Sequence, residues 1–169
     1  METPLEIERK FLIRRPEEAL LQAQPGAERI RIVQTYLEKD AHGANRRVRL
    51  WEQGRECKYI LTKKTRVTEI TRIEDEEEIS EERYTQLLAQ SDPKRRPIEK
   101  VRYRIPGNGH LYEIDLFPFW KKQAYLEIEL KSEKQKIVFP TFVMVLREVT
   151  ADAAYTNRAL ALRIPEEEV

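Results

Sequence analysis

The stretch Leu5-Glu6-Ile7-Glu8-Arg9-Lys10-Phe11-Leu12-Ile13 alternates charged and apolar side chains near the start of the chain. In an extended strand every second side chain shares a face, so Glu6, Glu8 and Lys10 stand in one row about 7 Å apart. The opposite face is apolar and carries Leu5, Ile7, Phe11 and Ile13. The stretch therefore predicts a strand with one core-facing side and one side that can hold a metal ion beside a phosphate.

The composition is highly charged but nearly balanced in sign. The 169 residues include 31 Lys and Arg against 30 Asp and Glu, and charged residues make up 36% of the chain. The length suits one domain with a substantial core, and no linker or low-complexity tract divides it, so we expect a single domain over residues 1–169. Because the charges cancel, a basic nucleic-acid binder is not expected.

Cysteine content and hydropathy limit the cellular context. Cys57 is the only cysteine, which excludes an intrachain disulfide and a thiolate zinc cluster. The N-terminus lacks the basic segment and apolar core of a signal peptide, and no stretch reaches the roughly 20 apolar residues that cross a bilayer. We therefore expect a soluble, cytoplasmic protein with no membrane partner. His42 and His110 lie beside glycines in predicted turns, which gives a histidine-based site little support.

Strand-like stretches recur along the chain and favour a mainly antiparallel β protein with a few peripheral helices, in the α+β class. Turn signals such as Gln53-Gly54 and Pro106-Gly107-Asn108-Gly109 separate them. The strands are expected at residues 5–13, 30–38, 47–52, 56–64, 69–79, 98–105, 111–117 and 124–131. Helices are expected at residues 16–24, at residues 80–90 behind a Ser80 cap, and at residues 152–162.

One face of most predicted strands is charged, and the charges segregate by sign. Arg47 and Arg49 share a face of one strand, whereas Glu127 and Glu129 share a face of another. These rows can form the solvated side of an ordinary sheet. They can equally line the polar interior of a closed barrel of about eight strands. Alternation alone leaves both readings open.

The two kinds of row suit complementary parts of phosphate chemistry. Lysine and arginine side chains can cage a polyphosphate, and carboxylates are hard ligands for Mg²⁺ or Mn²⁺. The candidate phosphate ligands are Lys10, Arg47, Arg49, Lys64, Lys100 and Arg102. The candidate metal ligands are Glu6, Glu8, Asp115, Glu127 and Glu129. A glycine-rich phosphate loop, a G-x-S-x-G elbow and an H-E-x-x-H helix are missing from the sequence. A glycosidase would not require so many cations on neighbouring strands.

Several short motifs resemble the CYTH superfamily, also called triphosphate tunnel metalloenzymes. Residues 6–10 match its E-x-E-x-K signature, and further matches follow in family order over nearly the whole chain. They lie at residues 34–37, 47–49, 59–64, 72–76, 99–103, 113–115, 127–129, 148–150 and 155–161. Glu2 departs from the family, part of which has a histidine ahead of the signature.

The resemblance implies an eight-stranded closed tunnel whose charged interior binds a triphosphate with a divalent metal ion. It implies catalytic roles for Glu6, Glu8, Lys10 and Glu129, and phosphate and metal roles for the two candidate sets above. Arg72, Glu74, Glu76 and Glu113 are also expected to line the tunnel by parity, with salt bridging as the alternative role. The doublets Arg46-Arg47 and Lys63-Lys64 leave the register open by one residue, and parity favours Arg47 and Lys64.

The leading hypothesis is a metal-dependent triphosphatase that hydrolyses a terminal phosphoanhydride, most readily that of inorganic tripolyphosphate. Thiamine triphosphatase and class IV-type adenylate cyclase are alternatives on the same fold, although no aromatic residue can be assigned to a base or thiazolium pocket. Trp51 and Trp120 are expected to pack at the rim or in the core. A non-catalytic module that binds polyphosphate or nucleotides is an alternative of another class. The oligomeric state stays open, with a homodimer as one option.

Overall fold

The computed structural model describes residues 5–169, apart from the side chain of Arg66. Glu2 therefore lies outside the described residues. The strands are β1 (Leu5–Arg14), β2 (Glu28–Tyr36), β3 (Asn45–Gln53), β4 (Glu56–Arg66), β5 (Thr71–Ile79), β6 (Ile98–Gly107), β7 (His110–Leu116), β8 (Gln123–Glu129) and β9 (Val145–Glu148). The first eight correspond to the eight predicted strands, and β9 was not predicted.

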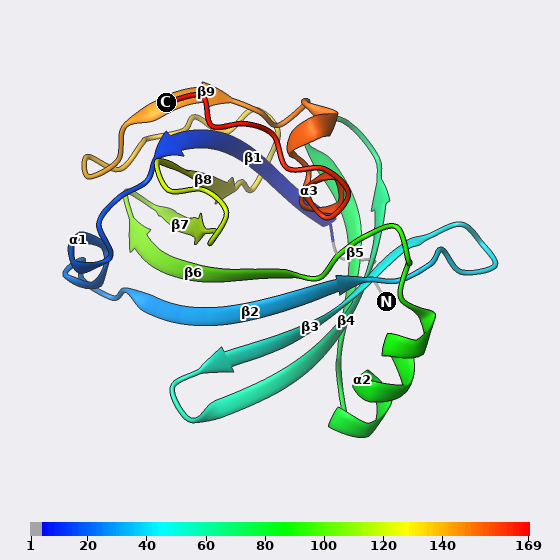
Figure 1. Cartoon of the computed structure of the whole chain (residues 1–169). Coiled ribbons are helices and arrows are strands. Elements are labelled where there is room, and N and C mark those ends of the chain that lie inside the picture. Colours follow the sequence, from blue (N-terminus) through cyan, green and yellow to red (C-terminus); the bar gives the residue numbers. More distant parts are fainter. Residues whose placement is uncertain (1–4) are drawn as a thin grey trace.

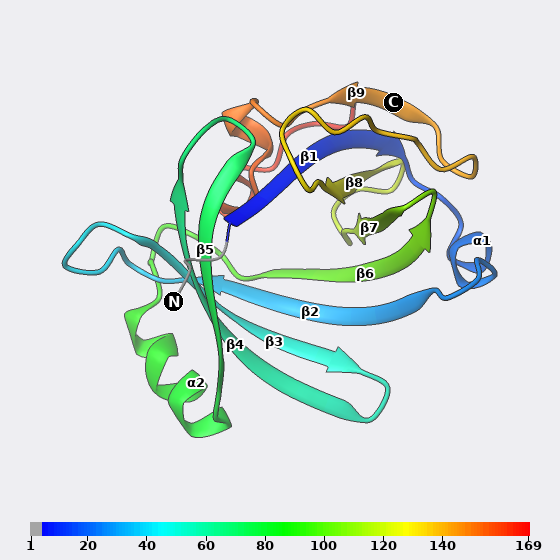
Figure 2. The ribbon, with the colours of Figure 1, turned by 180° about the vertical axis from the view of Figure 1, so that it is seen from behind.

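Antiparallel pairing closes these strands into a barrel (Figures 1 and 2). The sheet order is β5-β4-β3-β2-β6-β7-β8-β1-β9, and an additional pairing joins β5 to β1. Glu6 pairs with Arg72 at this closure, and Ile7 pairs with Thr71. The prediction of a closed eight-stranded barrel is confirmed, with β9 added outside the ring on the second half of β1.

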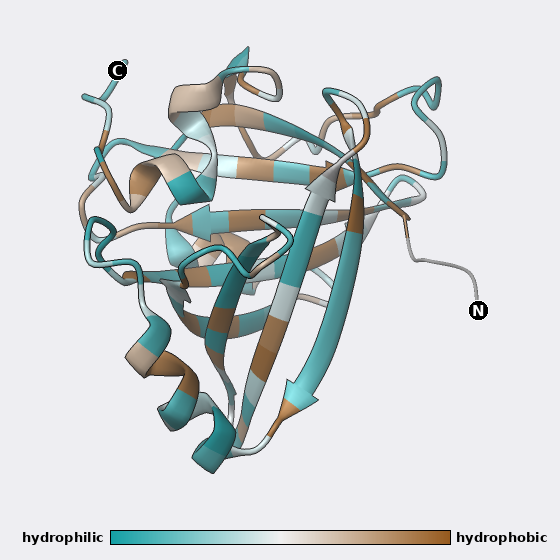
Figure 3. Cartoon of the chain, turned by 90° about the vertical axis from the view of Figure 1, so that its right-hand side faces the viewer, coloured by the Kyte–Doolittle hydropathy of each residue, from teal (hydrophilic) through white to brown (hydrophobic). Residues whose placement is uncertain are grey.

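Tight turns hold the neighbouring strands in register. Gly107 pairs with His110, so a two-residue loop of Asn108 and Gly109 connects β6 to β7. Both residues have positive φ, at 53° and 75°, which a type I′ hairpin turn requires and which asparagine and glycine adopt most readily. The alternating hydropathy of the strands is visible as teal and brown bands along the barrel wall in Figure 3.

Short helices cover parts of the outer surface. α1 (Glu18–Gln22) lies beside β6, and α2 (Glu81–Leu87), continued by the 3₁₀ turn η1 (Leu88–Gln90), packs outside β4 (Figure 1). The Ser80 hydroxyl accepts a hydrogen bond of 3.1 Å from the Arg83 amide, as the sequence predicted for this helix start. α2 covers an apolar cluster of Leu37, Val48, Leu61, Ile79 and Leu87.

The prediction of one helix over residues 152–162 is wrong. The segment forms the 3₁₀ turn η2 (Ala153–Tyr155) and the short helix α3 (Asn157–Leu160). Thr156 between them is extended, and its hydroxyl accepts from the Ala159 amide at 3.0 Å. Threonine competes in this way with the continuing helical backbone, so it ends one turn and caps the next.

The inner face of the barrel changes from charged to apolar along several strands. On β1 the inward row runs from Glu8 and Lys10 to Leu12. On β6 the inward row begins with apolar Ile98 and continues with Lys100 and Arg102. Leu12 and Ile98 belong to a buried floor cluster at one end of the barrel. The other buried members of this floor cluster are Tyr36, Phe117, Trp120, Tyr125, Val149, Tyr155, Leu160 and Ala161. The charged part of the interior is therefore a cup closed on one side by aromatic and aliphatic side chains.

A second cluster seals the outside of β1, β6, β7 and β8. Phe11 and Ile13 alternate with Leu12 along β1, so they point to this outer cluster while Leu12 points to the floor. Residues 137–145 pack over it as a strap, held where the Tyr112 hydroxyl donates to the Val138 carbonyl at 2.5 Å. Among the described residues, no helix has the length and hydrophobicity needed to cross a membrane.

Leu12→Ala is expected to lower the free energy of unfolding by about 2–5 kcal/mol, because truncation of this fully buried side chain leaves a cavity in the floor cluster. Urea unfolding followed by tryptophan fluorescence measures the change, since Trp120 lies in the same cluster. Leu20→Ala, at an exposed leucine, is the control and is expected to change stability by less than about 0.5 kcal/mol. Equal effects of the two substitutions would contradict the structural role of the floor.

Candidate active site

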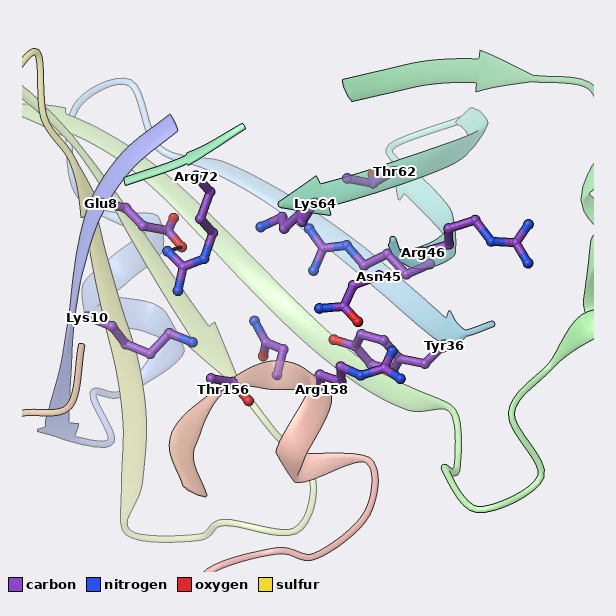
Figure 4. Close-up of a pocket in the computed structure, with 12 residues that line it drawn as sticks. Glu8, Lys10, Tyr36, Asn45, Arg46, Thr62, Lys64, Arg72, Thr156 and Arg158 are labelled. Carbon is purple, nitrogen blue, oxygen red and sulfur yellow. Dashed lines mark hydrogen bonds and ion pairs between the residues drawn. The ribbon is translucent and has the colours of Figure 1, made fainter. Parts of the chain in front are cut away.

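The barrel encloses a charged cavity of about 570 Å³. Side chains from β1 and from β3 to β8 line it. The predicted site residues among its lining are Glu6, Glu8, Arg47, Arg49, Lys64, Glu74, Glu76, Arg102, Glu113, Glu127 and Glu129. A smaller cavity of about 170 Å³ adjoins it and adds Lys10 and Arg72 to the predicted set (Figure 4). The charged rows thus face inward, which alternation alone had left open.

Carboxylates face one another across β1, β7 and β8. Glu8 pairs in register with Glu129, and Glu113 pairs with Glu127. Burial raises the pKa of Glu129, and the neighbouring Glu113 and Glu8 raise it further. Burial also raises the pKa of Glu113, where Glu127 adds to the effect and Arg102 opposes it. Glu8, Glu113 and Glu127 each have an ion-pair partner, whereas Glu129 forms no ion pair with the described residues. The acidic wall therefore crowds negative charge most strongly around Glu129.

Asp115 has a different environment from the other acids. Arg102 donates to both of its oxygens, at 2.8 and 3.0 Å, in a forked arrangement. Lys100 Nζ lies 2.8 Å from Asp115 Oδ2 as an ion pair, and neither side chain has any exposed surface. Although burial alone would raise the pKa of Asp115, Arg102 and Lys100 hold it well below its usual range. Burial also lowers the pKa of Lys100, to about 7.

The cations of β3 and β4 point toward the same cavity. Arg49 is almost fully buried and forms an ion pair with Glu76 of β5. Lys64 Nζ lies 3.7 Å from both Glu6 and Glu74. Burial and the adjacent Arg47 lower the pKa of Arg49 to about 9 and that of Lys64 to about 8. Positive charge is thus concentrated on this wall, opposite the acids. The carboxylates compensate it only in part, because Arg47 forms no ion pair with the described residues.

Lys10 and Arg72 connect the acidic wall to the floor and to the barrel closure. Lys10 Nζ lies 3.5 Å from Glu127 and donates to the Tyr155 carbonyl at 3.3 Å. The same nitrogen lies 4.7 Å from the centre of the Tyr125 ring. Arg72 Nη1 lies 3.5 Å from Glu8, and both side chains point into the smaller cavity in Figure 4.

The residues chosen by parity at the two basic doublets are those that line the cavity. Arg47 and Lys64 line the larger cavity. Arg46 lines only the smaller one, and its guanidinium donates to the Glu38 carbonyl at 2.8 Å. Lys63 lies 3.8 Å from Asp40, and about half of its side-chain surface is exposed. A one-residue shift would have exchanged the two faces of each strand.

Several lining residues were not among the predicted site residues. Arg104 continues the inward row of Arg102, so strand parity contained the signal for it. Trp51 lines the cavity wall beside Arg49, whose guanidinium carbon lies 5.5 Å from the ring centre. At the far end, Tyr36, Asn45, Thr156, Asn157 and Arg158 surround the smaller cavity (Figure 4). Strand parity gives no signal for the three members at the chain turn, although residues 34–37 and 155–161 are among the stretches that resemble the family. Asn45 shares the inward parity of Arg47.

The carboxylates suit a divalent metal ion whose remaining coordination positions are filled by phosphate oxygens and water. Within residues 5–169, no three acidic, histidine or cysteine side chains gather as a preformed metal site. Glu6 Oε2 and Glu127 Oε1 are buried and accept no hydrogen bond from the described groups. Mg²⁺ commonly binds one or two carboxylates together with phosphate oxygens and water. Their only polar contacts with the described groups are long ion pairs, to Lys64 at 3.7 Å and to Lys10 at 3.5 Å, so these oxygens fit such a metal ion.

Comparison with known proteins agrees with this geometry. No protein-family model matches the chain. The chain is 34% identical over 163 residues to a protein of Nitrosomonas europaea named inorganic triphosphatase, covering 95% of this chain and 99% of the relative. The crystal structure of the inorganic triphosphatase NE1496 superposes with a TM-score of 0.58 at 30% identity, covering 98% of this chain and 99% of that one.

A more distant structure shares the fold. The PH1819 protein of Pyrococcus horikoshii superposes with a TM-score of 0.57 at 19% identity, over 76% of this chain and 80% of that one. The level of identity to the Nitrosomonas protein, over nearly both whole chains, establishes common family membership. The chain belongs to the CYTH superfamily of triphosphate tunnel metalloenzymes, alongside the inorganic triphosphatase of Nitrosomonas europaea.

Proposed function

We propose that the protein is a metal-dependent triphosphatase that hydrolyses the terminal phosphoanhydride of inorganic tripolyphosphate. One observation carries the proposal: a single cavity has cations on β3, β4 and β6 facing carboxylates on β1, β7 and β8. The relative of 34% identity carries the name of this activity. Phosphoryl transfer needs positioning and charge neutralisation more than covalent help, and both walls of the cavity suit that requirement.

In this proposal the cations hold the phosphate groups. Arg47 and Arg49 offer forked donors to phosphate oxygens, and Lys10, Lys64 and Lys100 offer point charges. Arg102 has its Nε and Nη2 donors on Asp115, so it would contribute its charge and its Nη1 donor. Asp115 already accepts from Arg102 on both oxygens, so we assign it to the orientation of Arg102 and Lys100 instead of metal binding. This assignment differs from the role expected for Asp115 from the sequence.

The remaining acids would hold the divalent metal ion and handle the proton of the attacking water. Glu6, Glu8, Glu127 and Glu129 would be its ligands, with Mg²⁺ and Mn²⁺ as the candidate ions. When bound, the ion would neutralise phosphate charge and make a coordinated water more acidic. The pKa of Glu129 is raised toward the working pH, and a carboxylate with such a pKa is a better general base than an ordinary one.

The reaction consumes one water molecule. Its oxygen attacks the terminal phosphorus, the bond from that phosphorus to the bridging oxygen breaks, and Glu129 receives the proton. Orthophosphate and pyrophosphate leave. Lys10 and Arg102 stabilise the negative charge that develops on the phosphate oxygens.

The other expectations from the sequence stay as predictions. They are a single domain over residues 1–169, a cytoplasmic location, a possible homodimer and no nucleic-acid partner. The alternatives are thiamine triphosphatase, adenylate cyclase and a purely binding module. Assays with tripolyphosphate, ATP and thiamine triphosphate as substrates distinguish them. Chromatographic detection of cyclic AMP from ATP would identify a cyclase, and triphosphate binding without turnover would identify a binding module.

With Mg²⁺ or Mn²⁺, the purified protein is expected to release phosphate from tripolyphosphate, and excess EDTA is expected to stop it. Glu8→Gln should lower kcat by about 100-fold or more, because the acidic wall loses a metal-binding and proton-handling charge. Malachite-green detection of phosphate measures the rate. Glu77→Gln, an exposed position in the outward-facing row of β5, should keep the wild-type rate. No turnover of tripolyphosphate, ATP or thiamine triphosphate by the wild type would refute the proposal.

Glu129→Gln is expected to stabilise the metal-free protein at pH 7 while it lowers turnover. Glu129 opposes Glu8 directly, and relief of this repulsion should raise the free energy of unfolding by about 0.5 kcal/mol. Since the pKa of Glu129 is raised in the folded state, the gain should disappear as the pH falls through that value toward the ordinary 4.5. Urea unfolding in EDTA across this pH range measures the gain, and a loss of stability at pH 7 would contradict the crowded-acid interpretation.

A further inference from the structure

The ion pair between Arg49 and Glu76 differs from the other ion pairs of the cavity. The Arg49 side chain is 3% exposed, whereas the Glu76 side chain is 49% exposed. Glu76 thus reaches from the solvated rim of the barrel to a guanidinium inside it. Lys100, Arg102 and Asp115, by contrast, have side-chain exposures of 0%, 9% and 0%.

This difference in exposure decides which pair can separate. Moving Asp115 away from its partners would leave a carboxylate unpaired in a dry environment, at a cost of several kcal/mol. The Glu76 carboxylate can return to water, because about half of its side chain is already exposed. The cost of the separation falls on buried Arg49, unless another anion replaces the carboxylate there. Asp115 is therefore a fixed partner of its cations, and Glu76 is a partner that can leave.

If Glu76 moves away, buried Arg49 requires another anion to compensate its charge. Its guanidinium is buried, and its Nε atom has no hydrogen-bond partner among the described residues. Thr62 accepts from Arg49 Nη2 at 3.3 Å, but a hydroxyl supplies no charge. Arg47 on the same strand face adds positive charge nearby, and this repulsion lowers the pKa of Arg49 together with burial. A phosphate oxygen is the ligand that could replace the carboxylate at the same donors.

We propose that Glu76 is a displaceable counter-ion that occupies the phosphate position at Arg49 until substrate replaces it. The inference rests on the proposed function in one respect, namely that Arg49 holds a phosphate group. A phosphate must compete with a tethered carboxylate, so every ligand that places a phosphate group at Arg49 binds more weakly by the same factor. Glu76 would thereby set how tightly the site holds its substrate and its pyrophosphate product.

Calorimetric titration in EDTA tests the competition without turnover and without a metal ion. Glu76→Gln is expected to bind tripolyphosphate and pyrophosphate on the order of three- to tenfold more tightly than the wild type. Glu78→Gln is the matched control, since it removes the same charge from the same face of β5, one inward position farther along, where no ion pair is formed with the described residues. Its effect should be less than twofold.

The double variant Arg49→Gln/Glu76→Gln separates competition at Arg49 from a general change in potential. Relative to Arg49→Gln alone, it should gain no affinity, because the competitor has lost its target. An unchanged or weaker affinity of Glu76→Gln would overturn the inference while leaving the proposed function intact. An equal gain in Glu78→Gln, or a full gain in the double variant, would also overturn it. If the wild type and Glu76→Gln both fail to bind tripolyphosphate, the phosphate role of Arg49 falls together with the inference.

Discussion

The need to pair buried charge governs this protein. Closing the barrel through β1 and β5 moves the charged rows from water into a confined cavity. Each ion placed there loses hydration, and only opposite charge and well-aligned hydrogen bonds compensate for that loss. The strand order provides these opposite charges. It places the cations of β6 beside the carboxylates of β7, and the cations of β4 beside the carboxylates of β5. The ion pairs across these strands are therefore a condition of the fold as well as of its chemistry.

Stability comes from regions that do not take part in that chemistry. The floor cluster fills one end of the barrel, the strap covers the outer cluster, and α2 covers a third cluster. These apolar groups supply the burial that drives folding. The acidic wall acts in the opposite direction, because Glu8 faces Glu129 and Glu113 faces Glu127. Such unfavourable pairs persist where the surrounding structure is stable enough to tolerate them, which is typical of functional sites.

Burial also divides the carboxylates of the cavity by role. Asp115 is fully enclosed and bound by two cations, so it stays with Lys100 and Arg102 as a fixed part of the barrel interior. Glu129 lies near other acids and has a raised pKa, which suits metal binding and proton transfer. Glu76 spans the rim and the interior, which suits a partner that exchanges with substrate. Three residues of similar chemistry thus acquire different properties from their exposure and their neighbours.

The sequence by itself determined which side chains share a strand face, because a period of two is a local property of extended chain. It distinguished Lys64 from Lys63 and Arg47 from Arg46, and it located the eight barrel strands. Only the tertiary structure decided that these faces point inward, since that depends on pairing between Glu6 and Arg72, far apart in the chain. Exposure, the partner of each carboxylate and the chain turn at Thr156 likewise arise from contacts between distant segments, which no local pattern encodes.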